Sequence, residues 1–365
     1  MVRDIKCLIA IISLDQLDYT RQCIESILKI TEYPYRILIV DNGSNKETIQ
    51  YLKYLKEQNF AEVIFNSENL GWVKAVNQAM LYSDHGYVCI MNNDTVVYPR
   101  WLSEMVGTAQ KDNRIGIVNP LWELPKRFKG TLDDYYSNVI KDQRGEFIET
   151  DWARGFCFLV KRAVIDKIGG LDEAFSPAYY DDWDYSMRAI MSGFRCVRAM
   201  GALVYHYRNI TYSDILGGKE LNNLLKEKGV VFYKRWGRPL KILLIIDDTM
   251  KIDLFSLEDF ILHLLREQHT LFIIHNQKHF TIKHTNCTLQ YVPHFIRIRC
   301  SLNIMNNLRH STLKRYSVIL SSYKVKSFLE KVIFVKNDYT LKEIKNGLEN
   351  REEIIKVIGD LKKYT

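Results

Sequence analysis

The stretch Ile37-Leu38-Ile39-Val40-Asp41-Asn42-Gly43-Ser44 runs from four aliphatic residues directly into a polar turn. A short continuous apolar run is typical of a strand buried on both faces of a parallel sheet. Asp-Asn-Gly favours a tight turn, and Ser44 suits the residue that caps a following helix. A strand that leads through a turn into a helix predicts an α/β fold.

Similar units lie on both sides of this stretch. Further strands are predicted at residues 7–12, 62–65 and 87–91. Residues 17–28 and 46–55 place apolar side chains at helical spacing and are predicted to be amphipathic helices. The alternation favours a mainly parallel sheet flanked by helices.

A second polar turn, Asn92-Asn93-Asp94, closes the predicted strand at residues 87–91. In open α/β sheets, ligands bind beyond the carboxyl ends of the strands. The residues of this turn, and those of the turn at Asp41, are therefore candidates for a ligand site. Taken alone, each turn also suits an ordinary connection without a ligand.

The pattern changes after Pro120. Residues 121–150 are rich in charge and Tyr without clear periodicity, which suggests irregular or hairpin structure over the sheet edge. Further along the chain, strands are predicted at 155–160, 195–199 and 203–205, a helix at 183–191 and a helical stretch at 214–236.

Gly237-Arg238-Pro239 interrupts the helical stretch, and a new strand begins directly after it. We therefore divide the chain into a first domain, residues 1–238, and a smaller α/β domain, residues 239–365. The elements of the second domain are predicted at 241–246, 256–267, 271–274, 316–320, 331–335 and 351–362.

The formal charge of +8 is unevenly distributed. Residues 1–239 contain 31 Lys and Arg against 30 Asp and Glu, whereas residues 240–365 contain 20 against 13. No acidic residue lies between Glu267 and Glu330, so this basic stretch suits an anionic partner such as an acidic polymer, a lipid-linked diphosphate or the inner membrane surface. The stretch lacks the interleaved aromatics typical of nucleic-acid sites, and no nucleic-acid partner is expected.

Composition also limits the class of protein. The longest apolar runs are far shorter than the roughly 20 residues that cross a bilayer, and the N-terminus lacks a signal-peptide cleavage site. The seven cysteines form no CxxC pair, which argues against a disulfide framework or a zinc knuckle. We expect a cytoplasmic protein, with peripheral contact at the inner membrane surface as an extension of this prediction.

Taken together with further motifs, the two polar turns carry a family resemblance. The sequence resembles the family 2 glycosyltransferases, nucleotide-sugar enzymes of the GT-A fold, over about residues 5–210. His206 follows Asp182 by 24 residues, as in the branch that contains rhamnosyl- and galactofuranosyltransferases. In chain order, the motifs are Cys23–Leu28, Tyr33-Pro34, Ile37–Ser44, Asn69-Leu70-Gly71, Asn92-Asn93-Asp94, Trp101-Leu102, Gly155, Gly169–Glu173 and Asp181-Asp182-Trp183-Asp184 with Arg188 and Gly193.

The resemblance implies a UDP- or dTDP-linked sugar donor and a divalent cation. Asp94 and His206 would hold Mn²⁺ or Mg²⁺ against the diphosphate, because hard cations take oxygen ligands and offset the charge of a leaving diphosphate. Asp41 would accept a hydrogen bond from the nucleobase. The remaining residues expected at the donor are Ser13, Asp15, Asn69, Lys74, Asn77, Asn92 and Asn93.

Inverting transfer needs a carboxylate that takes a proton from the acceptor hydroxyl. Asp182 matches the family's base, and Asp181 and Asp184 are its rivals. On a helix that starts here, Asp181 and Asp184 share a face, whereas Asp182 points about 100° away. Arg188 is expected to pair with Asp184 in a structural role.

Two residues depart from the family's pattern. Asn92 stands where the metal motif usually opens with Asp, so the metal site should carry less negative charge. Asp181-Asp182 replaces the more frequent Glu-Asp pair. We expect neither change to remove a required function.

Other functions remain open at this point. A nucleotidyltransferase would share the sheet but should carry a Gly-rich, Arg-containing loop after its first strand, where this chain has Ser13-Leu14-Asp15-Gln16. A non-catalytic scaffold would be indicated by the loss of Asp94 or Asp182, and both are present. The second domain is interpreted as a docking, dimerisation or acceptor-binding module, and the acceptor as a glycan, a lipid-linked saccharide or an anionic polymer.

Overall fold

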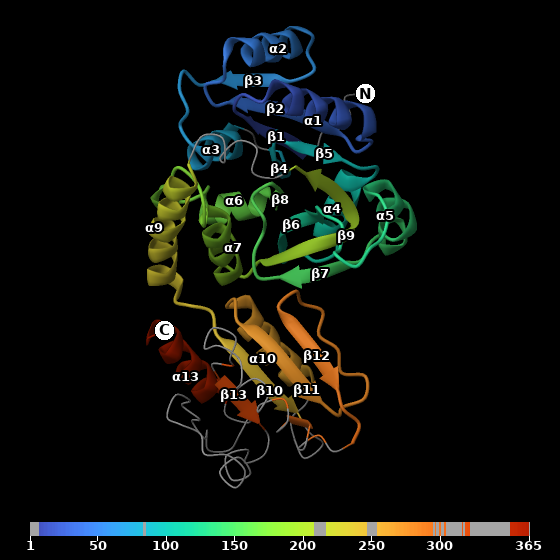
Figure 1. The fold of residues 1–365 in the computed structure, drawn as a ribbon, viewed down its shortest axis with the longest axis vertical. Coiled ribbons are helices and arrows are strands. Elements are labelled where there is room, and N and C mark those ends of the chain that lie inside the picture. The colour runs from blue at the N-terminus through green and yellow to red at the C-terminus, as the bar shows by residue number, and fades with distance from the viewer. Residues whose placement is uncertain are drawn as a thin grey trace. The chain divides into compact units, whose positions relative to one another are not determined.

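The computed structural model describes residues 7–82, 85–207, 217–246, 254–294, 296, 299–300, 303, 316, 318–321 and 351–364. Contacts along the chain divide it into two compact units, Met1–Lys234 and Arg235–Thr365. Each unit is an α/β structure with its own sheet (Figure 1). The catalytic and accessory roles assigned to the two parts stay predictions.

The N-terminal unit is built on a nine-stranded mixed sheet. Its strands run in the order β3-β2-β1-β4-β8-β6-β9-β5, and β7 pairs with β9. The β1–β2, β2–β3, β1–β4 and β6–β9 pairs are parallel, which confirms the mainly parallel sheet. The strands are β1 (Cys7–Ser13), β2 (Tyr35–Asp41), β3 (Glu62–Phe65), β4 (Tyr87–Asn92), β5 (Thr95–Val97), β6 (Ile115–Leu121), β7 (Phe147–Thr150), β8 (Cys157–Lys161) and β9 (Arg195–His206).

Helices cover this sheet and connect its strands. The amphipathic helices predicted at residues 17–28 and 46–55 are present as the first two of them. The helices are α1 (Leu17–Ile30), α2 (Lys46–Glu57), α3 (Trp72–Tyr82), α4 (Trp101–Gln110), α5 (Leu132–Asn138), α6 (Arg162–Ile168), α7 (Asp181–Met191) and α9 (Gly218–Trp236), with short 3₁₀ turns at Ile140–Gln143 and Glu173–Phe175.

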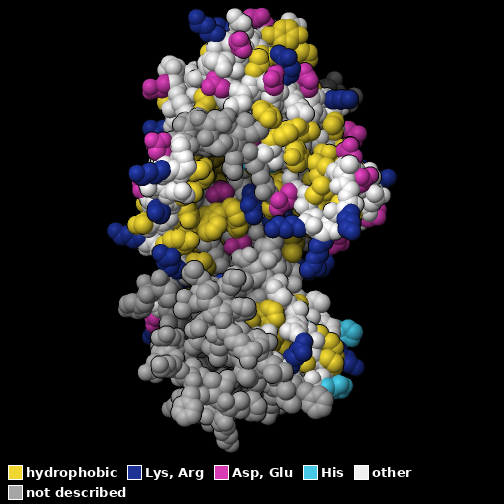
Figure 2. Space-filling view, viewed as in Figure 1, with side chains coloured by type: hydrophobic (Ala, Val, Ile, Leu, Met, Phe, Trp, Pro, Cys, Tyr) yellow, Lys and Arg dark blue, Asp and Glu magenta, His cyan; other side chains and the backbone are white. Residues whose placement is uncertain are grey.

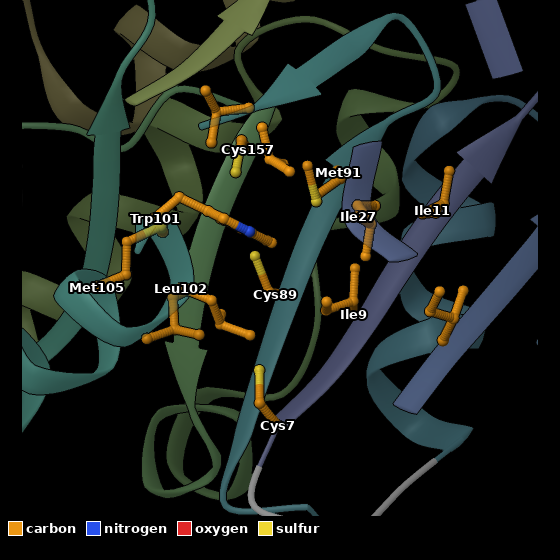
Figure 3. Packing of buried hydrophobic residues seen from close by; sticks show 14 of the residues in the cluster. Cys7, Ile9, Ile11, Ile27, Cys89, Met91, Trp101, Leu102, Met105 and Cys157 are labelled. Carbon is orange, nitrogen blue, oxygen red and sulfur yellow. The ribbon is translucent and has the colours of Figure 1, made fainter. Parts of the chain in front are cut away.

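The core of this unit lies against β1 and β4, whose apolar residues are completely buried. Figure 3 shows the ring of Trp101, from α4, beside Cys89 of β4 and Cys157 of β8. Burying such runs removes several hundred Å² of apolar surface from water at about 25 cal/mol per Å². Packing in the core therefore fixes the positions of the central strands. Because the polar turns directly follow these strands, the start of each turn is fixed as well.

Two parts of the unit differ from the sequence expectation in detail. The strands predicted at residues 195–199 and 203–205 form one strand, β9, because it pairs with β6, β7 and β5 along its length. The interval at residues 121–150 contains α5, a 3₁₀ turn and β7, and the antiparallel pair of β7 with β9 confirms the hairpin-like structure at the sheet edge.

The C-terminal unit has a four-stranded parallel sheet in the order β12-β11-β10-β13. The predicted strand at residues 331–335, and the basic residues Arg309, Lys314, Arg315, Lys324 and Lys326, lie outside the described residues. Its described elements are β10 (Lys241–Ile246), α10 (Leu254–Arg266), β11 (Thr270–His275), β12 (Cys287–Tyr291), β13 (Val318–Ser321) and α13 (Arg351–Tyr364).

Within the described part of the chain, no helix combines the length and apolar character that a bilayer crossing needs.

Glycine at position 43 is required by the turn after β2. Its φ is +85°, and a Cβ there would lie 2.7 Å from the backbone carbon of Glu68. We expect Gly43→Ala to lower the free energy of unfolding by about 1–3 kcal/mol through backbone strain and that clash. Gly107, inside α4, has open space around it, so Gly107→Ala should raise the free energy of unfolding by about 0.5–1 kcal/mol. Denaturant unfolding of both variants checks this difference; equal effects would contradict it.

Candidate active site

The carboxyl ends of β1 and β2 carry two buried polar groups with unmet hydrogen-bonding capacity. Ser13 and Asp41 are register partners and are fully buried. The Ser13 hydroxyl and both carboxylate oxygens of Asp41 lack a well-formed hydrogen bond among the described residues. Burial raises the pKa of Asp41, an effect that the neighbouring Ser44 partly opposes. Buried polar groups are normally paired, so this edge suits a ligand that brings a hydrogen-bond donor.

The loop after β3 is held to this edge by side-chain amides. Asn42 donates to Asn69 Oδ1 at 2.9 Å and accepts from the backbone N–H of Leu70 at 3.1 Å. Asn69 Oδ1 also accepts from the N–H of Gly71 at 2.9 Å. The predicted donor residue Asn69 is therefore placed next to Asp41's turn, in a position fixed by Asn42.

Asp15 joins two loops of the same edge. Its backbone N–H donates to Ser44 Oγ at 2.8 Å, and its carboxylate accepts from the N–H of Asn45 at 2.6 Å. Asn93 donates to Thr20 at 2.8 Å and so ties the turn after β4 to α1. These contacts position the loops around the predicted donor site.

Asn77 and Lys74 are placed differently from the other predicted donor residues. Asn77 exchanges two hydrogen bonds with the backbone of Leu171, at 2.7 and 2.9 Å, and thereby holds the Gly169–Leu171 turn against α3. Lys74 is exposed on the same helix. These two hydrogen bonds give Asn77 a structural role, and a role for either residue at the donor stays a prediction.

Asp94 and His206 meet although they are far apart in the sequence. Thr95 of β5 is the register partner of His206 of β9, which brings Asp94 Oδ1 within 3.1 Å of His206 Nε2. Asn92 Nδ2 lies 3.3 Å from the same nitrogen. Phe156 stacks on the imidazole with ring centroids 4.9 Å apart, which fixes the orientation of the ring.

This pair fits one side of a divalent cation site. Asp94 is almost completely buried, and its Oδ1 makes no well-formed hydrogen bond among the described residues, although His206 Nε2 lies 3.1 Å away. The described residues contain no cluster of three or more His, Cys, Asp or Glu that could hold a metal ion. A cation bound here would therefore need oxygen atoms from a ligand or from water to complete its coordination.

A cavity of about 580 Å³ opens beside this pair. Asp94 and His206 line it together with an aromatic wall that includes Trp72, Trp122, Trp152 and Tyr180. On the face shown in Figure 2, hydrophobic side chains gather over α7 and α9, with acidic side chains among them. Its volume is in the range typical of small-ligand sites. The lining residues are Trp72, Asn92, Asp94, Trp122, Trp152, Arg154, Gly155, Phe156, Ala178, Tyr179, Tyr180, Asp181, Asp182, Trp183, His206 and Leu225.

The three carboxylates at the start of α7 have different surroundings. Asp181 accepts from Trp72 Nε1 at 3.0 Å. Asp184 is fully buried and pairs with Arg188 at 2.8 Å, as predicted. Asp182 lines the cavity and accepts from the backbone N–H of Gly155 and of its own neighbour Trp183, both at 2.9 Å.

Burial raises the pKa values of Asp181 and Asp182, which also repel each other as neighbouring acids. Hydrogen bonds from Trp72 to Asp181, and from Gly155 and Trp183 to Asp182, oppose the rise. A raised pKa suits a group that must accept a proton near neutral pH. Asp184 is committed to Arg188 and does not line the cavity, which leaves Asp182 and Asp181 as the candidates for a base.

The aromatic wall was missed by the sequence analysis. Trp72 lines the cavity, and its indole N–H donates to Asp181 Oδ2 at 3.0 Å. Trp122, Trp152 and Tyr180 come from three separate loops, and no local pattern links them. Tyr180 directly precedes the motif that begins at Asp181, and Trp152 lies shortly before the motif residue Gly155, so proximity to a motif was the one available signal.

Replacing Asp181 or Asp184 by Asn should change the stability of the protein in opposite directions. Since burial raises the pKa of the Asp181–Asp182 pair, the folded state binds more protons than the unfolded state, and stability falls as pH rises above about 4. We expect Asp181→Asn to gain stability relative to the parent between pH 5 and pH 8. Asp184→Asn should lose on the order of 3 kcal/mol at both pH values because it breaks a buried ion pair. Thermal unfolding at the two pH values checks this; a pH-independent Asp181→Asn difference would refute the assignment.

The family match described next lies within the N-terminal unit of the chain. Residues 8–169 match the family model of glycosyl transferase family 2. The chain is 26% identical over 218 residues to the O-antigen biosynthesis protein RfbC of Myxococcus xanthus, covering 53% of this chain and 16% of that protein. It is 24% identical over 217 residues to the N-acetylglucosaminyl-diphospho-decaprenol L-rhamnosyltransferase of Mycobacterium tuberculosis, covering 50% of this chain and 70% of that protein.

A solved structure of GalNAc-T7 with UDP, GalNAc and Mn²⁺ matches 64% of this chain and 51% of that one, with a TM-score of 0.49 and 17% identity. The chain thus spans only a small part of some relatives and most of others. The N-terminal unit has the GT-A fold, with a mostly parallel central sheet flanked by helices. Residues 8–169, somewhat less than half of the chain, are similar to glycosyl transferase family 2.

Proposed function

We propose that the N-terminal unit transfers a sugar, with inversion, from a nucleoside-diphosphate sugar to a hydroxyl group of an acceptor. The observation that carries this proposal is that Asp182 and the Asp94–His206 pair line one cavity. Such a cavity offers a group that binds diphosphate through a cation and a group that accepts a proton. Inverting transfer needs both on the two sides of one anomeric carbon.

The nucleotide would occupy the edge formed by β1 and β2. Asp41 is buried with both oxygens lacking a well-formed hydrogen bond, and an N–H of a nucleobase would satisfy one of them. The Ser13 hydroxyl, buried beside it, offers a second hydrogen bond. UDP and dTDP both carry such an imide N–H, so either donor fits this argument.

The diphosphate would lie toward Asp94 and His206. When bound there, Mn²⁺ or Mg²⁺ would supply charge to offset the departing diphosphate. Asp94 would contribute a carboxylate oxygen and His206 its Nε2 atom. Asn92, which lies near His206 Nε2, keeps the site less negative than an Asp would.

Asp182 would take the proton of the attacking hydroxyl. The N–H groups of Gly155 and Trp183 donate to its two carboxylate oxygens. These hydrogen bonds hold the carboxylate in one orientation. Asp181 receives the indole N–H of Trp72 instead. We therefore assign the base to Asp182 and a supporting role to Asp181.

The aromatic wall supports a saccharide acceptor. The ring centroids of Trp152 and Trp183 are 4.8 Å apart, and those of Tyr180 and Trp183 are 5.4 Å apart. Aromatic faces bind the C–H faces of sugar rings through dispersion and the ring quadrupole. The names of the M. xanthus and M. tuberculosis relatives agree with a role in cell-surface polysaccharide synthesis.

The C-terminal unit would serve as a docking, dimerisation or acceptor-binding module. Its excess of Lys and Arg supports an anionic acceptor or peripheral contact with an anionic membrane surface. The scattered cysteines of the sequence, none in a CxxC pair, support the proposed cytoplasmic localisation.

Nucleotide binding can be measured without knowing the acceptor. We expect one of UDP, dTDP, GDP and CMP to raise the unfolding midpoint by several degrees with Mn²⁺, and EDTA to remove most of that shift. Asp94→Ala should lose the Mn²⁺-dependent part, whereas Asp41→Asn should weaken binding with and without Mn²⁺. Thermal unfolding of the parent and both variants checks this. A lack of any shift in the parent would favour a non-catalytic scaffold.

Asp182→Asn separates chemistry from donor binding. We expect this variant to lose transfer by a factor of at least about 10² while it binds the nucleotide as the parent does, because the base acts after binding. Asp166→Asn is the matched control, since Asp166 is exposed on α6 and does not line the cavity, so this variant should retain the turnover of the parent. Release of nucleoside diphosphate from the donor is the readout. Retained turnover in Asp182→Asn would transfer the role of base to Asp181.

A further inference from the structure

The segment Trp152–Gly155 is attached to the first turn of α7 at two points. The N–H of Ala153 donates to Ser186 Oγ at 2.8 Å, and that hydroxyl donates to the carbonyl of Asp182 at 2.6 Å. The N–H of Gly155 donates to Asp182 Oδ2 at 2.9 Å. The residue between these two points, Arg154, is therefore held at a fixed place relative to Asp182.

The backbone of Arg154 is fixed from the other side by Asn119 of β6. Asn119 Oδ1 accepts from the N–H of Arg154 at 3.0 Å, and Asn119 Nδ2 donates to its carbonyl at 3.1 Å. Asn119 is 2% exposed, so these bonds are shielded from water. An amide that bonds both backbone groups of one residue leaves that residue little freedom.

The guanidinium of Arg154 lies between two indole rings. Its Cζ is 4.2 Å from the ring centroid of Trp122 and 4.5 Å from that of Trp152. Arg198 lies over the same Trp122 ring at 4.4 Å but does not line the cavity. Stacking of this kind holds a cation by its faces and fixes the position of its charge.

The charged groups that face Asp182 are few. Asp94, Asp181 and His206 line the same cavity as Asp182, and Asp182 raises the pKa of Asp181. Arg154 lines this cavity as well, directly before the residue whose N–H donates to Asp182, and its charge favours the ionised form of that carboxylate. Gly155 and Trp183 contribute neutral hydrogen bonds. Among these partners, Arg154 alone brings a positive charge, and a cation near a buried carboxylate lowers its pKa.

We propose that Arg154 is a positioning residue whose stacked charge keeps Asp182 ionised for its role as base. This proposal rests on the proposed function. The residue has no direct part in proton transfer. Its contribution is the placement of one positive charge, at a site set by Asn119, Trp122 and Trp152, against a carboxylate that burial would otherwise leave protonated.

The pH dependence of turnover tests this role. We would measure release of nucleoside diphosphate from the donor that the thermal shifts identify, between pH 5 and pH 9. Arg154→Met should move the acidic limb upward by about one pH unit or more, so that the rate falls roughly tenfold near pH 6 and recovers at high pH. Arg154→Lys should keep the limb close to that of the parent. Arg198→Met, which removes the other cation on Trp122, should leave the limb in place.

A stability cycle tests the same interaction without activity. Without Arg154, the ionised form of Asp182 loses its compensating charge, so Arg154→Met should lose more stability at pH 8 than at pH 5. In an Asp182→Asn background, that pH-dependent part should disappear. An equal loss at both pH values and in both backgrounds, or an unmoved acidic limb, would overturn the proposal. If the parent consumes no nucleotide sugar, the proposed function fails, while the cycle still shows whether Arg154 acts on Asp182.

Discussion

Three carboxylates in the first turn of one helix, Asp181, Asp182 and Asp184, have to be accommodated in a largely apolar setting. A helix N-terminus favours negative charge, but only by a fraction of a kcal/mol to about 2 kcal/mol. That is too little for three acids of which Asp181 and Asp184 are buried and Asp182 is partly buried. Each acid has a different partner. Asp181 accepts from an indole N–H, Asp182 from two backbone N–H groups, and Asp184 pairs with an arginine. The arginine-paired acid contributes structure, whereas the other two retain raised pKa values and can exchange protons.

The second half of the site depends on the topology of the sheet. β9 runs parallel to β6 and antiparallel to β5 and β7, so its last residue reaches the turn that follows β4. Without this crossing, His206 and Asp94 would have no reason to meet. The same sheet edge carries Ser13 and Asp41, because parallel β1, β2 and β4 end together. Backbone pairing thus places Ser13, Asp41, Asp94 and His206 at the same edge of the sheet.

The sequence predicted those features that depend on neighbouring residues, such as single strands and the faces of a helix. Continuous apolar runs identified β1, β2 and β4, and the helical spacing of acids identified Asp182 as differently oriented from Asp184. The single strand β9 was not foreseen because Met200 and Gly201 interrupt its apolar pattern, and pairing with three neighbours overrides that interruption. The contacts of Trp72 with Asp181, and of Arg154 with two indoles, join segments that only the folded sheet brings together. The role of Asp94 and His206 was available only from family spacing, since neither residue has a metal-binding neighbour in the sequence.

Charge in the cavity links the two halves of the proposed reaction. Asp94, Asp181 and Asp182 line it against the single guanidinium of Arg154, and a diphosphate would add further negative charge to this enclosed space. Coulomb repulsion at such distances is substantial when water is excluded. A divalent cation at Asp94 would relieve it, so cation and nucleotide should each increase the affinity of the other by the same factor, as reciprocal linkage requires. The guanidinium of Arg154 is stacked on Trp122 and Trp152, so we do not expect it to take the place of that cation. The three acids of the cavity therefore give a reason for a cation on the proposed donor side, while Arg154 supplies positive charge in the cavity that Asp182, the proposed base, also lines.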